Sequence, residues 1–125
     1  MTKYIDENIT INPNITLDIS QSRNGYMGMK LDIEGVDSNE YRDIFSSYKN
    51  NNRLYRMKNG AYLDLKDKDI EQAFKLIDIL NIYNDFDNMK IPNNKAIYLE
   101  KLIEEEDLSF VNGSKYVSNV VKKIW

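Results

Sequence analysis

The 125-residue sequence contains no cysteine and no histidine, and it has only two prolines and five glycines. Without cysteine and histidine the chain cannot build an ordinary zinc site, and it has neither a thiolate nucleophile nor a histidine base. The absence of cysteine also removes disulfide support, which fits a reducing compartment. No apolar run approaches the roughly 18 residues that a membrane-spanning helix needs. We therefore expect a cytoplasmic protein with no membrane segment, no metal ion and no cofactor.

Composition and charge are typical of a soluble globular protein. Hydrophobic residues make up 42% and charged residues 30% of the chain, and the length suits one domain with a sizeable core. We expect a single domain over residues 1–125, in which residues 1–13 form a loose N-terminal arm or an edge segment. The formal net charge of −3 argues against attraction of the whole protein to nucleic acid, while a local basic face stays compatible with it.

A first β-hairpin is predicted from two runs in which apolar and polar residues alternate, at residues 15–19 and 26–34. Both apolar faces meet one core only if an odd number of residues joins the strands. We therefore expect a three-residue turn, Arg23-Asn24-Gly25, with Gly25 at its left-handed position. This register places Asp18 opposite Lys30 on the solvent face.

A second hairpin surrounds Asn59-Gly60, a pair that strongly favours a turn between two alternating runs. A three-residue turn, Lys58-Asn59-Gly60, places the apolar side chains on one face and sets Tyr62 opposite Arg56 on the other. The residues expected on the buried face are Tyr55, Met57, Ala61, Leu63 and Leu65.

Helical patterns follow each hairpin. Asp37 can cap a helix that ends near Lys49, with Glu40 reaching back in a capping box, and Asp67 can cap a second helix. Further helices are expected at residues 94–105 and 114–124, a short strand at 108–111, and a loop at 81–92. The predicted fold class is α+β, in which two antiparallel β-hairpins form one small sheet packed with three to four α-helices.

Three short segments carry a resemblance to a known family. They are residues 31–36 (LDIEGV), 55–65 (YRMKNGAYLDL) and 96–102 (AIYLEKL). In this order and spacing they resemble the accessory domain that precedes the ATPase core in bacterial Snf2-type helicases. The resemblance implies a Snf2 helicase-associated domain over residues 14–125, followed after Trp125 by the ATPase core. The Cys-rich zinc-binding segment of some relatives has no counterpart here.

No residue run matches a motif for nucleotide or metal binding. The GxxxxGK[ST] loop is absent, because Gly113-Ser114-Lys115 lacks the earlier glycine that lets backbone amides bind phosphate. Asp85 and Asp87 carry oxygen atoms that Ca²⁺ and Mg²⁺ prefer, but a third ligand is missing at loop spacing. The acidic run at residues 104–107 is typical of a solvated surface. We therefore expect no catalytic residue and no small-molecule substrate.

Basic residues are the candidate contacts with DNA, near which a helicase accessory domain would lie. They are predicted at the first turn, on the outer face of the second hairpin and at the end of the last helix. Such cations bind phosphate groups, and the outward-facing Tyr26 and Tyr62 suit base stacking or a protein interface. If neighbouring aspartate and glutamate side chains balance their positive charge, the same residues would be ordinary surface cations. The candidate contacts with DNA or a partner are Arg23, Arg56, Lys58, Tyr62, Lys122 and Lys123.

Two functions from different classes fit these features. The first is a non-catalytic accessory domain of a bacterial Snf2-type ATP-dependent DNA helicase, which packs on or regulates the ATPase core and contacts DNA. The alternative is a free-standing interaction module or inhibitor that binds a protein through its acidic and tyrosine-rich face. A docking domain predicts an exposed apolar patch near the C-terminal helix, to which Trp125 would contribute.

Overall fold

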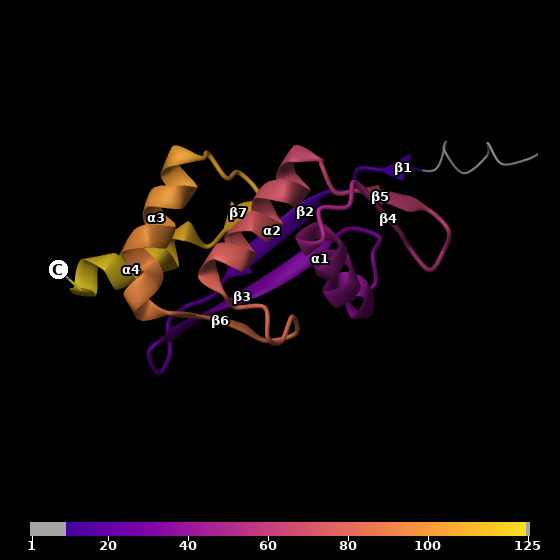
Figure 1. Cartoon of the computed structure of the whole chain (residues 1–125). Coiled ribbons are helices and arrows are strands. Elements are labelled where there is room, and N and C mark those ends of the chain that lie inside the picture. Colours follow the sequence, from indigo (N-terminus) through magenta and orange to yellow (C-terminus); the bar gives the residue numbers. More distant parts are fainter. Residues whose placement is uncertain (1–9, 125) are drawn as a thin grey trace, which may run out of the picture.

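A computed structural model describes residues 10–124, which form two mixed β-sheets and four α-helices (Figure 1). The larger sheet has the strand order β6-β3-β2-β7, and the smaller has the order β1-β5-β4. The α+β class is confirmed, but the prediction that both hairpins join one antiparallel sheet is wrong. In the larger sheet the strands are β2 (Ile15–Ile19), β3 (Tyr26–Ile33), β6 (Met89–Pro92) and β7 (Val111–Asn112).

The smaller sheet forms because the second hairpin pairs with a strand from the predicted N-terminal arm. β1 (Thr10–Ile11) runs parallel to β5 (Tyr62–Asp64), which pairs antiparallel with β4 (Leu54–Arg56). Residues 10 and 11 therefore form an edge strand and not a loose arm, whereas the rest of the predicted arm before residue 10 lies outside the described residues. Each hairpin finds its additional strands elsewhere in the chain, so the two hairpins do not pair with each other.

The register of the first hairpin is the predicted one, but its turn is shorter. Asp18 lies opposite Lys30. Arg23 and Tyr26 exchange two backbone hydrogen bonds of 2.8 and 3.0 Å, so only Asn24-Gly25 form the turn. Both turn residues have positive φ, 52° and 85°, as a type I′ turn requires. The predicted three-residue turn is therefore wrong.

A β-bulge reconciles the two-residue turn with the predicted register. The Ser20 N–H donates to the Gly28 carbonyl at 3.0 Å, and beyond this point two residues, Gln21 and Ser22, lie opposite Met27 alone. The extra residue restores the parity that keeps the apolar faces together. The apolar residues of both strands therefore face one core, as predicted, but a bulge at the end of β2 achieves this and not a longer turn.

The second hairpin has the predicted turn and register. Arg56 lies opposite Tyr62, and the Met57 N–H donates to the Ala61 carbonyl at 2.8 Å across the three-residue turn Lys58-Asn59-Gly60. Met57 and Ala61 are buried, as expected from the alternating pattern.

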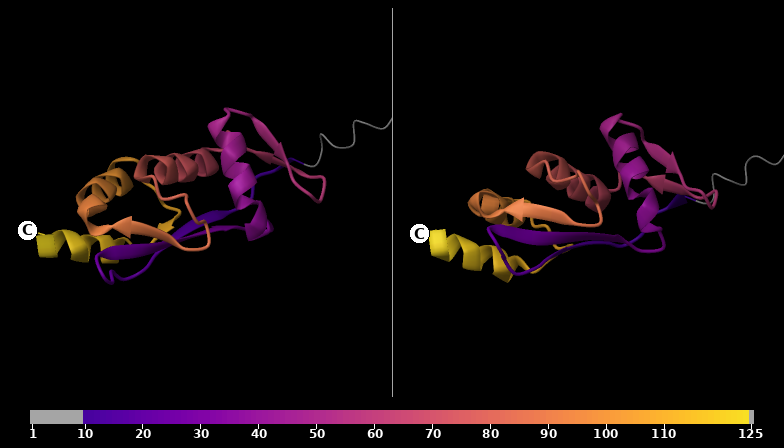
Figure 2. Two further views of the ribbon diagram at one scale, coloured as in Figure 1. Left: turned by 60° about the horizontal axis from the view of Figure 1, so that its bottom comes forward. Right: turned by 90° about the horizontal axis from the view of Figure 1, so that it is seen from below.

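Four α-helices lie close to their predicted spans: α1 (Tyr41–Lys49), α2 (Lys68–Leu80), α3 (Ala96–Glu105) and α4 (Ser114–Ile124). Asp67 caps the second of them by accepting a hydrogen bond from the Ile70 N–H at 3.3 Å. Figure 2 shows α2 and α3 on one side of the long strands β2 and β3, with α4 beside the β2–β3 turn. Asp18, Lys30 and Asp32 are exposed on the sheet.

The predicted capping box at α1 is wrong. Asp37 accepts a hydrogen bond from the Asn39 N–H at 3.0 Å and caps a short 3-10 turn, Ser38–Glu40, that leads into α1. The Glu40 side chain is buried and binds the second hairpin instead of its own helix end.

The predicted loop at residues 81–92 contains the strand β6. Its residues Met89 and Ile91 pair with Met29 and Met27 of β3, and both are buried. Four residues that end in Pro92 are too short for a periodic pattern to stand out, and proline is tolerated because β6 is an edge strand. The prediction of a loop is therefore wrong for residues 89–92.

β7 is also shifted from its predicted place at residues 108–111. Only Val111 overlaps, and β7 pairs in parallel with Leu17 and Asp18 of β2. Gly113 follows at a φ of +87°, and a Cβ at this position would collide with the Ile19 carbonyl. The chain can therefore pass from β7 into α4 only through glycine.

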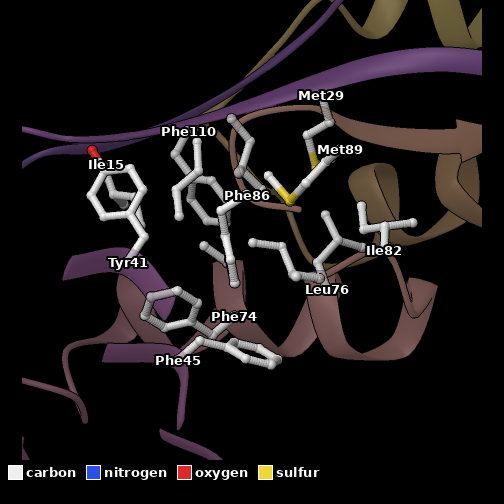
Figure 3. Close-up of a cluster of buried hydrophobic side chains, with 14 of the residues drawn as sticks. Ile15, Met29, Tyr41, Phe45, Phe74, Leu76, Ile82, Phe86, Met89 and Phe110 are labelled. Carbon is white, nitrogen blue, oxygen red and sulfur yellow. The ribbon is translucent and has the colours of Figure 1, made fainter. Parts of the chain in front are cut away.

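One cluster of buried hydrophobic side chains joins both sheets to the helices. Its aromatic centre is Phe45, whose ring lies 5.7 Å from Phe74, 5.5 Å from Phe86 and 4.8 Å from Tyr83, between ring centroids. Figure 3 shows these phenylalanines facing the side chains of the larger sheet, such as Met29. This common core positions the two ends of the molecule relative to each other.

Candidate functional site

The six candidate contact residues lie at two opposite ends of the molecule (Figure 1). One end is the β4–β5 hairpin, and the other is formed by the β2–β3 turn and α4. The fold thus separates residues that charge alone would group together. The first end carries Arg56, Lys58 and Tyr62, and the second carries Arg23, Lys122 and Lys123.

At the β4–β5 end the predicted cation–π contact is present. The Arg56 guanidinium carbon lies 5.9 Å from the centre of the Tyr62 ring on the neighbouring strand. Arg56 and Lys58 are exposed, and Tyr62 is half-buried. One face of the tyrosine is therefore engaged by a cation of the same hairpin.

Glu40 attaches this hairpin to the start of α1. Its carboxylate accepts a hydrogen bond from the Tyr55 hydroxyl at 3.1 Å and another from the Lys58 N–H at 3.2 Å. Only 6% of Glu40 is exposed. Burial, and then the hydrogen bond to Glu40, raise the pKa of Tyr55 to about 12, so its hydroxyl stays protonated as a donor. The carboxylate thus has a structural role.

At the other end, α4 and the β2–β3 bulge enclose a cavity of about 420 Å³. Lys122 and Lys123 line it from α4, and the Ser22 hydroxyl donates to the Asn93 side chain at 2.9 Å on the opposite wall. The remaining lining is made of Gln21, Tyr116, Asn119 and Val120.

A second hollow of about 290 Å³ adjoins the first, because Gln21 lines both. It lies between the β2–β3 turn and β6, and it is lined by Arg23, Tyr26 and Lys90 among other residues. The Tyr26 side chain is 46% exposed. We refer to the surface carrying Arg23, Lys90, Lys122 and Lys123 as the basic end.

The basic end lacks internal charge compensation. Neither hollow is lined by a described aspartate or glutamate. Within residues 10–124 the ion pairs are Lys49–Asp78 and Lys66–Glu71, and none involves a cation of the basic end. These four cations are therefore available to an external anion.

A third surface is an apolar groove between α2 and α3. It has a volume of about 270 Å³ and is bordered by Ile79, which is 40% exposed, and Tyr98, which is 47% exposed. Leu76, Leu102 and Leu108 also line it, together with Gln72, Lys75 and Glu106. We refer to this surface as the α2–α3 groove; α4 does not line it, and Trp125 lies outside the described residues.

Asp85 and Asp87, the acidic residues considered as metal ligands, belong to a hydrogen-bonded turn. Asp85 accepts a hydrogen bond from the Asp87 N–H at 3.0 Å, which stabilises the turn before β6. In the described part of the chain, no three acidic side chains gather closely enough to hold a metal ion.

A sequence model of the family described as bacterial SNF2 helicase associated matches residues 5–125. The chain belongs to this family. No curated protein and no solved structure matches the sequence. The family assignment confirms the resemblance drawn from the three short segments, and it indicates an accessory region associated with a Snf2-type helicase.

For this SNF2 helicase-associated chain, sequence reasoning missed several surface residues. Lys90 lies in a segment that is predicted as a loop, although the alternation of Met89, Lys90 and Ile91 is a signal for the strand that carries it. Ile79 and Tyr98 lie outside the core stripes of α2 and α3, so the apolar periodicity of these helices does not single them out.

None of the described helices is long and apolar enough to cross a membrane.

Proposed function

We propose that this chain is a non-catalytic accessory domain of a bacterial Snf2-type ATP-dependent DNA helicase or translocase. In this proposal it forms a single domain that packs on the ATPase core of the same cytoplasmic polypeptide, with the core following Trp125. The observation that carries the proposal is the family match, which extends over residues 5–125. By packing on the core, the domain would orient it or change its activity.

The α2–α3 groove is the surface that best suits contact with the core. Large exposed apolar side chains that border a concave surface are characteristic of protein interfaces, and tyrosine is enriched at their centres. Ile79 and Tyr98 are two of the four most exposed large hydrophobic residues in the described chain, and they border the same groove. Lys75 and Glu106 add one charge of each sign to the lining.

Replacing Ile79 and Tyr98 together by serine should weaken binding of this chain to the separately expressed ATPase core by at least about tenfold. A tenfold loss of affinity corresponds to about 1.4 kcal/mol of binding free energy. Apolar and aromatic side chains at the centre of an interface commonly contribute this amount or more. Isothermal titration calorimetry with the two purified proteins measures the change. Neither residue belongs to the fully buried core, since 40% of Ile79 and 47% of Tyr98 are exposed, so the fold should tolerate the substitutions.

Leu54→Ser is the matched control, because Leu54 is 43% exposed but lies on β4, away from the groove. It should leave the affinity for the core unchanged. An equal loss in both variants, or no loss in the double variant, would show that the core does not bind at the α2–α3 groove.

The alternative proposal is a free-standing interaction module or inhibitor. The same groove supports it, since an apolar surface of this kind can bind a protein other than an ATPase core. The two proposals differ in whether the chain and the core belong to one polypeptide.

A further inference from the structure

We infer that the α2–α3 groove binds an amphipathic α-helix of the ATPase core, which lies along the groove as a third helix beside α2 and α3. This inference rests on the proposed function, in which the core binds at this groove. It goes further by assigning the secondary structure of the bound segment, the spacing of its apolar side chains and the position of its charges.

The residues that line the groove form one stripe along each helix. On α2 they run from Gln72 to Ile79 at spacings of three, one and three residues, and on α3 Tyr98 and Leu102 are four residues apart. Residues at these spacings lie on one face of a helix. At a rise of about 1.5 Å per residue, the α2 stripe is about 10 Å long, or about two helical turns. The groove therefore follows the helices that border it, and a third helix can pack along it.

A hydrogen bond between the two helices sets the direction of the groove. The Lys95 ammonium donates to the Leu80 carbonyl at 2.6 Å, so the end of α2 lies beside the start of α3. The two helices therefore run in opposite directions, as Figure 1 shows. Ile79 and Tyr98 consequently lie at one end of the groove, and Glu106 lies at the other. The groove has an apolar end and a charged end before any partner binds.

The groove offers side chains and few free backbone groups. Except near the helix ends, the backbone N–H and C=O groups of α2 and α3 bond to each other within each helix. An extended segment in the groove would place its own N–H and C=O groups against Leu76 and Leu102 without partners, which is unfavourable. A helix satisfies these groups internally and presents only side chains. The groove therefore favours a helix over a strand or an irregular segment.

Two charges define the sides of the bound helix. Lys75 on α2 and Glu106 after α3 are exposed and line the groove. Within residues 10–124 neither of them belongs to an ion pair. We therefore expect an acidic side chain of the bound helix beside Lys75 and a basic one beside Glu106. Between them the helix should carry apolar residues at positions i, i+3 or i+4, and i+7.

A second copy of this chain is a less suitable occupant. Within residues 10–124 the apolar stripes of α1, α2 and α4 are buried in the common core. The groove is concave, and two concave surfaces leave unfilled space between them. We therefore expect the helix to come from the ATPase core.

Hydrogen exchange of the separately expressed ATPase core, alone and with the complete 125-residue chain, identifies the bound segment. One protected segment with the expected apolar spacing should be found. A synthetic peptide of this segment should bind the chain and gain helical circular dichroism on binding. Proline in the middle of the peptide should weaken binding at least about tenfold, because proline breaks a helix interior.

Lys75→Glu should weaken binding of the peptide about three- to tenfold, because it replaces an attraction by a repulsion at the edge of the interface. Lys30→Glu makes the same change of charge on the exposed face of the larger sheet and should leave the affinity unchanged. Thermal unfolding of both variants confirms that the fold is retained.

A peptide that binds without gaining helix, or one whose affinity is unchanged by proline, would overturn the inference. If the core still binds the chain in that case, the proposed function stands. A core that does not bind the chain at all would overturn the proposed function together with the inference. Light scattering that shows a dimer of the chain, dissociated by Ile79→Ser with Tyr98→Ser, would assign the groove to a second copy and would also overturn the inference.

Discussion

Replacing Phe74 by alanine should lower the free energy of unfolding by about 3–5 kcal/mol, because the substitution leaves a cavity in a close-packed core. Phe74 is fully buried in the middle of α2, and its ring lies 5.7 Å from the ring centroids of both Phe45 and Tyr48. The ring therefore connects α1 to α2 above the larger sheet. Equilibrium unfolding in urea, followed by far-UV circular dichroism, measures the loss.

Ile79→Ala on the same helix is the control for this substitution. Ile79 is 40% exposed, so its truncation removes much less buried surface and should lower the free energy of unfolding by only about 1 kcal/mol. If Phe74→Ala cost no more than this control, the placement of α2 on the core would be wrong.

Replacing Glu40 by alanine should lower the free energy of unfolding by about 2–4 kcal/mol. The change leaves the Tyr55 hydroxyl and the Lys58 N–H without their acceptor, and each of these part-buried hydrogen bonds to a carboxylate contributes about 1–2 kcal/mol. The loss should fall mainly on the β4–β5 hairpin, whose backbone amides should then exchange hydrogen faster. Urea unfolding and hydrogen exchange together measure the size and the location of the effect.

Glu34→Ala provides a comparison with the same change of charge. Glu34 is exposed, and its side chain accepts a single long hydrogen bond of 3.4 Å from Asn14. Its removal should change stability by about 0.5 kcal/mol or less. Glu40→Gln should fall between the two alanine variants, since the amide keeps one acceptor oxygen. Equal effects at Glu34 and Glu40 would refute the assigned role of Glu40.

Local patterns in the sequence were sufficient to predict much of the secondary structure. The alternating runs gave the registers of both hairpins, including Asp18 opposite Lys30 and Arg56 opposite Tyr62. The last helix, Ser114–Ile124, lies where its apolar spacing predicted. These features depend on periodicity and turn chemistry within a few residues.

The arrangement of the strands could not be predicted in the same way. β1 pairs with β5, and β7 pairs with β2, between segments far apart in the chain. Strands of two residues contain no period, so only the packed structure reveals them. Glu40 illustrates the same limit. Its side chain could form either a capping box with its own helix or hydrogen bonds to the second hairpin, and in the structure it binds the hairpin.

The candidate surfaces were predicted only in part for a related reason. Charge and residue type picked out Arg23, Lys122 and Lys123, and these lie at one end as parts of two adjoining hollows. The same criteria also picked out Arg56 and Lys58, which the fold places at the opposite end (Figure 1). Composition identifies available cations, whereas only the fold shows which of them can bind the same ligand.

The size of the native polypeptide tests the central claim most directly. An antibody raised against this chain, used on an immunoblot of a lysate of the source organism, should detect a band many times heavier than 14.7 kDa. Such a band is expected if the chain and a Snf2 ATPase core form one polypeptide. A band at 14.7 kDa alone would contradict the claim and would favour the free-standing interaction module.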